Sequence, residues 1–233
     1  KQDIKGVGKY IDRLSTRIGN GTGPDIFRYH NSWLTQLIQP KPLLQPLPND
    51  VVNSLQMNKF YKVVQDDLRV SGAYYGVPIH FDTLALFVNV QSFAAAGISE
   101  YPSTWDDLAN SARKLTVKDA LGRIVTSGAA LGTYDNIAHA SDIISLLLIQ
   151  NGASLLDLNG ASKQNAYDAL DFYTSFAKGD GNVWDDTLEN SKLAFAKGNL
   201  AMYFGYSWDI LEIKALNPNL EFAIVPVPHL PSR

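Results

Sequence analysis

The sequence predicts a layered α/β fold, and three observations support this. Helical stripes of apolar residues alternate with short apolar strand candidates along the whole chain. The run "LALFVNV" (84–90) is apolar on both faces, as a strand covered on both sides must be. Most helix candidates also carry a capping residue at the start or a glycine or proline stop at the end.

The first third of the chain is rich in helix candidates bounded by Gly19, Pro40 and Pro42. A stripe from Ile4 to Ile18 predicts the first helix. The elements expected here are a helix over 4–18, a short buried strand "PDIF" (24–27), a helix from Asn31 or Ser32 to about Gln39, a helix from Asn49 or Asp50 to about Gln65, and a hairpin in "LRVSGAYYGVPIHF" turning at Ser71-Gly72.

The remaining elements follow the same alternation. Ser103 is expected to cap a helix, with Asp106 three residues on as a variant of the capping box. The expected elements are strand 84–90, a helix from Ser103 to Leu115, strand 128–133, helix 140–152, a helix striped by Ala166, Leu170, Tyr173 and Ala177, helix 190–198, strand 200–204, a helix starting near Trp208, and strand 220–228.

Composition excludes several classes of protein. A net charge of −3 over 233 residues gives no electrostatic reason to expect nucleic acid or an anionic membrane as partner. No apolar run approaches the roughly 20 residues that span a bilayer. With no cysteine, disulfides and thiolate metal sites are impossible.

Motifs for catalysis are missing from the sequence. There is no nucleophile elbow, phosphate-binding glycine loop, dinucleotide fingerprint or zinc helix motif. The four histidines are scattered, with none at metal-ligand spacing. Adjacent acidic pairs such as Asp185-Asp186 are typical of solvated loops and helix starts. The sequence therefore predicts no catalytic residue, no metal and no cofactor.

Six stretches in one order resemble a known family. They are "GTGPDIF", "YYGVPIHFDTLALFVNVQSFAAAGI", "PSTWDDLANSARKL", "LLLIQNGASLLD", "AFAKGNLAMYFGYSW" and "PNLEFAIVPVP". Together they resemble the extracellular solute-binding proteins of ABC importers, in the carbohydrate-binding branch typified by maltose-binding protein. Family chains are usually longer, so this one looks incomplete at both termini.

The resemblance implies a two-lobed, periplasmic-binding-protein-like (type II) fold that closes on a sugar without catalysing a reaction. The expected organisation is a partial N-terminal lobe over 1–81, a hinge or crossover strand over 82–90 and a partial C-terminal lobe over 91–233. In open α/β sheets, ligands bind beyond the carboxyl ends of strands.

In the N-terminal lobe this places Tyr29, after the expected strand 24–27, among the ligand-binding candidates. His30 and Asn31 occupy a stretch where relatives carry polar sugar contacts, and His80 is a further candidate. Relatives often have a tryptophan or aspartate where this chain has Arg28 to Asn31, which leaves the preferred sugar open. Asn31 could equally be only a helix cap.

In the C-terminal lobe, Tyr206 and Trp208 follow strand 200–204, and their flat rings suit the C–H face of a sugar. Either could instead be a hydrophobic plug at the helix start. Asp82 falls where the family often has a carboxylate facing the cleft, although it could simply form an Asx turn with Thr83. Further candidates lie in the loop "GTYDNIAHASD": Tyr134, Asp135 and Asn136. Trp105 and Trp184 are expected to be packing residues.

The implied partners are a small-molecule sugar and the transmembrane subunits of an ABC permease. The implied location is the periplasm or the cell surface, as a monomer held by a lipid anchor attached upstream. Two alternatives stay open: a receptor for an amino acid, polyamine or metal ion, and a glycoside-processing enzyme that uses Asp82. Tyr74-Tyr75 cannot both ligate one ion, because neighbours in a strand face opposite sides.

Overall fold

The computed structural model describes residues 7–39 and 42–230. The chain divides into two compact units, residues 1–81 and residues 82–233. The first expected helix begins at Val7 in the described part, and Ile4 lies outside it.

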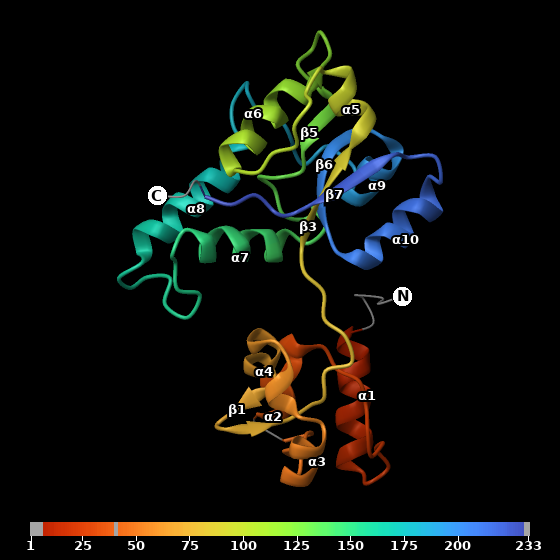
Figure 1. Ribbon diagram of the computed structural model, residues 1–233, viewed down its shortest axis with the longest axis vertical. Helices are drawn as coiled ribbons and strands as arrows, with labels where there is room; N and C mark the ends of the chain where they lie inside the picture. The colour runs from red at the N-terminus through yellow and green to blue at the C-terminus, as the bar shows by residue number, and fades with distance from the viewer. Residues whose placement is uncertain (1–6, 40–41, 231–233) are drawn as a thin grey trace. The chain divides into compact units, whose positions relative to one another are not determined.

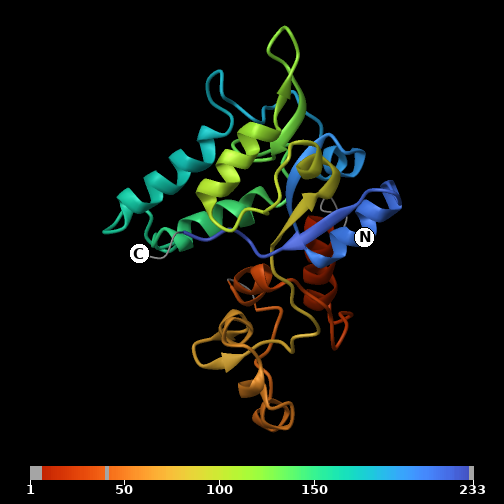
Figure 2. The same cartoon turned by 45° about the horizontal axis from the view of Figure 1, so that its top comes forward.

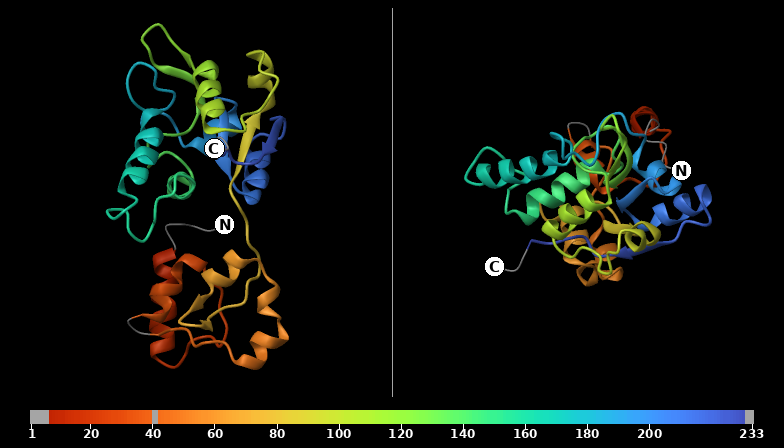
Figure 3. Two further views of the ribbon diagram at one scale, coloured as in Figure 1. Left: turned by 60° about the vertical axis from the view of Figure 1, so that its left-hand side comes forward. Right: turned by 90° about the horizontal axis from the view of Figure 1, so that it is seen from above.

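The first unit consists of short helices beside one small hairpin, as Figure 3 shows. Its small core is formed by Met57, Val64 and Leu68, with Tyr29 packed against them. The elements are α1 (Val7–Gly19), the 3₁₀-helix η2 (Asn31–Trp33), α2 (Leu34–Ile38), α3 (Asn49–Ser54), the 3₁₀-helix η3 (Met57–Lys59), α4 (Lys62–Asp67), β1 (Arg69–Val70) and β2 (Ala73–Tyr74).

The predicted hairpin is confirmed, with Ser71 and Gly72 at φ values of 50° and 87° between the antiparallel strands β1 and β2. Two predictions for this unit are wrong. Residues 24–27 form no strand, and Ile26 is 89% exposed, so it has no buried face to pair or pack. The helix expected from Asn49 to Gln65 is broken because Gln56 adopts a left-handed conformation with φ 51°.

The second unit is organised around a five-stranded sheet in the order β4-β5-β6-β3-β7. Strand β3 pairs antiparallel with both β6 and β7, β5 is parallel to β6, and β4 is antiparallel to β5. The strands are β3 (Ala85–Asn89), β4 (Val117–Lys118), β5 (Ile124–Ala129), β6 (Leu200–Gly205) and β7 (Phe222–Val225). The tip of the β4–β5 hairpin projects from the sheet in Figure 2.

Helices cover both faces of this sheet (Figure 1). On one face, Trp105 stacks on Phe204 with 5.7 Å between ring centroids. On the other, Phe195 packs against Phe87 and Tyr203. The helices are α5 (Val90–Ala95), α6 (Trp105–Leu115), α7 (Ala140–Gln150), α8 (Lys163–Ser175), α9 (Ser191–Lys197) and α10 (Ser207–Leu216). The predicted α/β layering is confirmed, and Trp105 and Trp184 are buried packing residues.

Several boundaries in this unit differ from expectation. The strand expected over 128–133 begins at Ile124 and ends at Ala129. Helix α5 and strand β4 were not predicted, because both are too short to show a periodic pattern. No helix in the described part of the chain combines the length and apolar character of a membrane span.

The cap of α6 is Thr104 rather than Ser103. The Thr104 hydroxyl accepts a hydrogen bond from the Asp107 backbone N–H at 3.1 Å, and the Asp107 carboxylate accepts one from the Thr104 backbone N–H at 3.1 Å. The Thr104 hydroxyl also donates to the Asp107 carboxylate at 2.7 Å, and this bond, followed by the one from the Thr104 backbone N–H, lowers the pKa of the Asp107 carboxyl. The capping partner of the helix is therefore Asp107 and not Asp106.

Replacing Thr104 with alanine is expected to lower the free energy of unfolding by about 1 kcal/mol, since the cap's hydrogen bonds are lost. Denaturant titration measures this. Ser103→Ala is the matched control, because its hydroxyl makes only a 3.4 Å contact with Asp107. An equal loss in both variants would contradict the assignment of the cap.

Candidate functional site

Two aromatic rings lie together at the end of β6 and the start of α10, which are adjacent in Figure 1. Tyr206 and Trp208 stack with 4.4 Å between ring centroids and 17° between their planes. Trp208 is 43% exposed, so its indole is partly open to solvent. We call the Tyr206–Trp208 pair the aromatic platform.

His139 packs against the platform from the start of α7. Its ring is perpendicular to that of Tyr206, with 4.8 Å between centroids, and lies 6.2 Å from that of Trp208. Edge-to-face packing of this kind is the favoured arrangement for rings whose faces are electron-rich. The His139 ring therefore packs against the platform roughly perpendicular to its two rings.

Asp82 lies beside the platform through Ser207, the residue between the two rings. The Asp82 carboxylate accepts hydrogen bonds from the backbone N–H of Ser207 at 2.8 Å and from the Ser207 hydroxyl. It also accepts the Thr83 backbone N–H at 2.8 Å, the Asx-type contact considered above. The carboxylate thus ties the segment that enters β3 to the first residue of α10.

A second carboxylate, Asp142, contacts the platform from the first turn of α7. The Tyr206 hydroxyl donates to Asp142 Oδ2 at 3.0 Å. Burial, and then the negative charge of Asp142, raise the pKa of the Tyr206 phenol, so the ring stays neutral. Asp142 thus contacts the Tyr206 hydroxyl, and Asp82 contacts Ser207, the residue between the two rings.

Asp209 lies behind the platform and is completely buried. Its Oδ2 accepts hydrogen bonds from Tyr203 Oη at 2.9 Å, from the Tyr206 backbone N–H at 3.1 Å and from His139 Nε2 at 2.9 Å. Its Oδ1 forms an ion pair with Lys192 Nζ at 2.6 Å. Burial alone would raise the pKa of Asp209, but the bonds from His139 and Lys192 outweigh it and lower the pKa to about 2.

Gly205 makes room for this carboxylate. A Cβ at position 205 would lie 2.8 Å from Asp209 Oδ2 and 2.5 Å from the ring of Tyr203. Such distances are inside van der Waals contact, so a larger residue would displace Asp209. The glycine at the end of β6 is thus required by the close approach of a buried charge.

The other candidates in the second unit are not joined to the platform by any contact among the described residues. Tyr134 and Asp135 are exposed. Asn136 donates from Nδ2 to the carbonyls of Asp185 and Leu188, and its Oδ1 accepts from Trp184 Nε1 and from the Thr133 hydroxyl. With its amide committed to the protein, Asn136 holds the loops around Trp184 together.

In the first unit, the Tyr29 hydroxyl is buried against Gly76 without a hydrogen-bond partner, and burial raises its pKa to about 12. His30 caps η2, accepting the Ser32 backbone N–H on Nδ1. The Asn31 side chain donates to Asp67 Oδ2 at 2.6 Å, so it is not the helix cap. His80 is exposed.

Three residues of the site were missed by sequence reasoning: His139, Asp142 and Asp209. His139 and Asp142 belong to the loop "GTYDNIAHASD" that was singled out, but to its far end. The signal that points to them is position, because residues at the start of a helix that follows a strand lie near the strand's carboxyl end.

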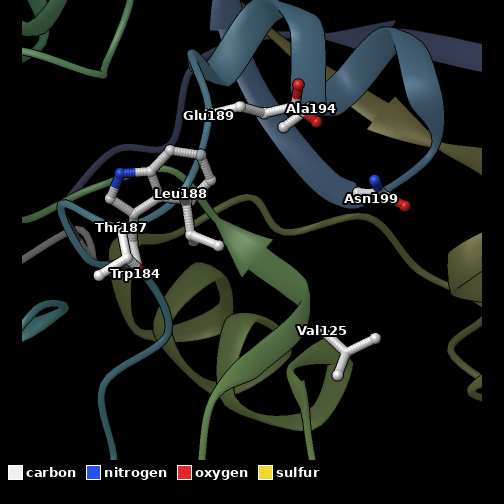
Figure 4. A pocket seen from close by; sticks show the side chains of 7 residues that line it. All are labelled: Val125, Trp184, Thr187, Leu188, Glu189, Ala194 and Asn199. Atoms are coloured by element: carbon white, nitrogen blue, oxygen red, sulfur yellow. The ribbon is translucent and has the colours of Figure 1, made fainter.

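A separate shallow pocket of about 180 Å³ lies between β5, the 184–189 loop and the start of β6 (Figure 4). Its walls include Trp184, whose indole N–H is already bonded to Asn136, and Glu189, which is paired with Lys197. It shares no residue with the platform. The polar groups of these two side chains are thus bonded within the protein.

The platform and its carboxylates suit a ligand with an apolar face and a rim of hydroxyl groups. A flat ring pair offers the first, and carboxylate oxygens accept hydrogen bonds from the second. Among the described residues, no group of three or more His, Cys, Asp or Glu side chains is placed to hold a metal ion.

Comparison with known proteins agrees with this fold. A Brucella abortus (strain 2308) protein is 24% identical over 229 residues, which cover 95% of this chain and 54% of that protein. The maltotriose-binding protein of Pyrococcus abyssi is 28% identical over 95 residues, 41% of this chain and 19% of that protein. The chain spans about half the length of the first of these relatives.

Solved structures match along almost the whole chain. An ABC substrate-binding protein from Listeria monocytogenes in complex with cycloalternan has a TM-score of 0.74 at 18% identity, covering 97% of this chain and 58% of that one. A mannotriose-bound structure has a TM-score of 0.65 at 23% identity, covering 94% and 58%. These likenesses show a shared fold, of which this chain holds part.

The model of one family matches residues 3–232, nearly the entire sequence. That span contains β3, β6 and the whole platform. The chain therefore belongs to the bacterial extracellular solute-binding protein family.

Proposed function

We propose that this chain is the substrate-binding component of an ABC importer for a sugar or oligosaccharide, and that Tyr206 and Trp208 stack against a sugar ring. The observation that carries this is the partly exposed platform with Asp82 and Asp142 beside it. In this reading Asp82 acts both as the anchor of Ser207 and as a hydroxyl acceptor.

The geometry favours a sugar over the alternatives. An amino acid would call for a cationic group to bind its carboxylate, whereas the ionisable side chains bonded to Tyr206 and Ser207 here are the acidic residues Asp142 and Asp82. A metal ion would call for converging ligands. Relatives and structural neighbours with maltotriose, mannotriose or cycloalternan in their names support the same class.

The proposal extends to delivery and place. The loaded protein would hand its sugar to the transmembrane subunits of a permease, without breaking a bond. It would work in the periplasm or at the cell surface, held there by a lipid anchor. Closure of a second lobe over the sugar, with contributions from Tyr29, His30, Asn31 or His80, stays a prediction.

Isothermal titration calorimetry of the full-length protein tests the ligand class. The panel contains mannotriose, maltotriose and arabino-oligosaccharides, with an amino acid mixture, spermidine and divalent cations beside them. We expect saturable binding of at least one sugar, and unchanged sugar in product analysis of the same samples. Binding confined to the other solutes, or cleavage of a glycosidic bond, would contradict the proposal.

A further inference from the structure

Stability alone does not explain why the protein buries a carboxylate at position 209. Removing a carboxylate from water is costly, and well-packed apolar residues can replace a buried ion pair with little or no loss. Here the carboxylate is fully buried and has four partners, which are Tyr203, Tyr206, His139 and Lys192. The other contacts of these partners indicate what the carboxylate contributes.

Two of the four partners lead directly to the platform. The hydrogen bond from the Tyr206 backbone N–H to Asp209 fixes the backbone of Tyr206 directly after β6. The position of the Tyr206 ring follows from it. His139 carries the ring that packs perpendicular to Tyr206, and the same ring lies 6.2 Å from that of Trp208. One carboxylate oxygen of Asp209, Oδ2, therefore accepts hydrogen bonds both from the backbone of Tyr206 and from His139, whose ring packs against Tyr206.

The chemistry of the His139–Asp209 contact fixes the histidine ring. An ionised carboxylate only accepts hydrogen bonds, so Nε2 must carry the proton. With Nε2 aimed at Oδ2, the imidazole cannot turn without losing that bond. The orientation of the imidazole ring relative to Tyr206 is thus set by its hydrogen bond to Asp209.

The backbone of His139 is also unusual. Among the described residues, only Gln56, Ser71 and His139 combine a side chain with a positive φ, and His139 has φ 62°. Gln56 interrupts a helix and Ser71 forms a hairpin turn, so both are local chain reversals. His139 instead adopts this conformation, which is unfavourable for a residue with a side chain, at the position where it contacts both Asp209 and the platform.

We propose that His139 and Asp209 are positioning residues that hold Tyr206 and Trp208 in their stacked geometry and thereby set the affinity for sugar. The role in affinity rests on the function proposed above. The role in geometry does not, because it depends only on contacts within the protein, from Asp209 to His139 and to the Tyr206 backbone. The two parts can therefore fail separately.

The geometry is tested without any ligand. The near-ultraviolet circular dichroism of Trp208 is isolated by subtracting the spectrum of Trp208→Phe from that of the parent protein. The same subtraction is made in a His139→Asn background, since asparagine tolerates a positive φ. We expect the Trp208 signal to lose most of its amplitude in that background, while His229→Asn, the same change at an exposed histidine, leaves it unchanged.

Affinity is tested by a double-mutant cycle with the sugar that binds most tightly in the calorimetric panel. His139→Asn is expected to weaken binding by about tenfold, and its effect should largely vanish when Trp208 is already phenylalanine, because contacting residues are coupled. His139→Gln, which keeps a donor for Asp209 but has no ring, serves if the asparagine variant does not fold.

Three results decide the matter. An unchanged Trp208 spectrum in the folded His139 variant overturns the positioning role. If the spectrum changes but the losses of sugar affinity caused by His139→Asn and Trp208→Phe simply add, the proposed effect of His139 on affinity through Trp208 is overturned. If no sugar binds at all, the proposed function fails while the spectra still decide whether His139 positions the rings.

Discussion

Trp208→Ala is expected to weaken sugar binding by about 30-fold, or on the order of 2 kcal/mol, as removal of a central aromatic contact typically does. The indole is 43% exposed, and among the described residues its ring contacts are the stacked Tyr206 and the tilted ring of His139. Little of the core depends on it. Calorimetry with the tightest-binding sugar measures the loss, and thermal unfolding checks the fold.

Leu211→Ala is the matched control, because Leu211 is an exposed apolar residue on the same helix. It is expected to change neither affinity nor stability. If Trp208→Ala instead lowers the melting temperature sharply and binds sugar as the parent does, Trp208 is a plug for the start of α10. That outcome would remove the observation on which the proposed function rests.

Asp209→Ala is expected to lower the free energy of unfolding by about 3–5 kcal/mol. The substitution leaves Lys192 without its buried partner and Tyr203 without an acceptor, and removing one member of a buried pair is among the most destabilising changes known. Denaturant titration at pH 7 measures the loss. Asp186→Ala, at an exposed loop position, is the control and should stay within about 0.5 kcal/mol of the parent.

The same carboxylate makes stability depend on acid. The pKa of Asp209 is about 2 in the folded protein, below its ordinary value of 3.8, so the folded state favours the ionised form. That contribution, about 2.5 kcal/mol, is fully present above pH 4 and is lost as the pH falls from about 4 to about 2. The gap between the parent and Asp209→Ala should therefore narrow over this range. A gap that is constant with pH would show that Asp209 is not ionised when folded.

Local patterns predicted most of the elements of the second unit. Apolar character on both faces identified β3, and Gly198 marked the end of α9 with its φ of 84°. Local patterns failed where a single residue decided the outcome. Gln56 carries no sequence signal for the left-handed conformation that divides the expected helix, and Thr104 competed with an equally suitable Ser103.

The site was predicted only in part, because its contacts join distant parts of the chain. The aromatic pair is local, and its place directly after the strand in "AFAKGNLAMYFGYSW", together with the family resemblance, predicted it. Asp82 is 125 residues from Ser207, Tyr206 is 64 from Asp142, and His139 is 70 from Asp209. No periodic pattern encodes such pairings, so the network behind the rings became visible only in three dimensions.

The place of β3 between β6 and β7 bears on how the protein is made. Its two neighbours are residues 200–205 and 222–225, so more than 100 residues must be synthesised after β3 before either can pair with it. At roughly 5–20 residues per second, the apolar segment 85–89 waits about 5–20 seconds with both edges open. Open apolar edges invite pairing with other chains. A nascent chain of this topology therefore benefits from a chaperone that covers residues 85–89 until β6 has been synthesised. Export of the chain before it folds would delay the risk of pairing with other chains until after translocation.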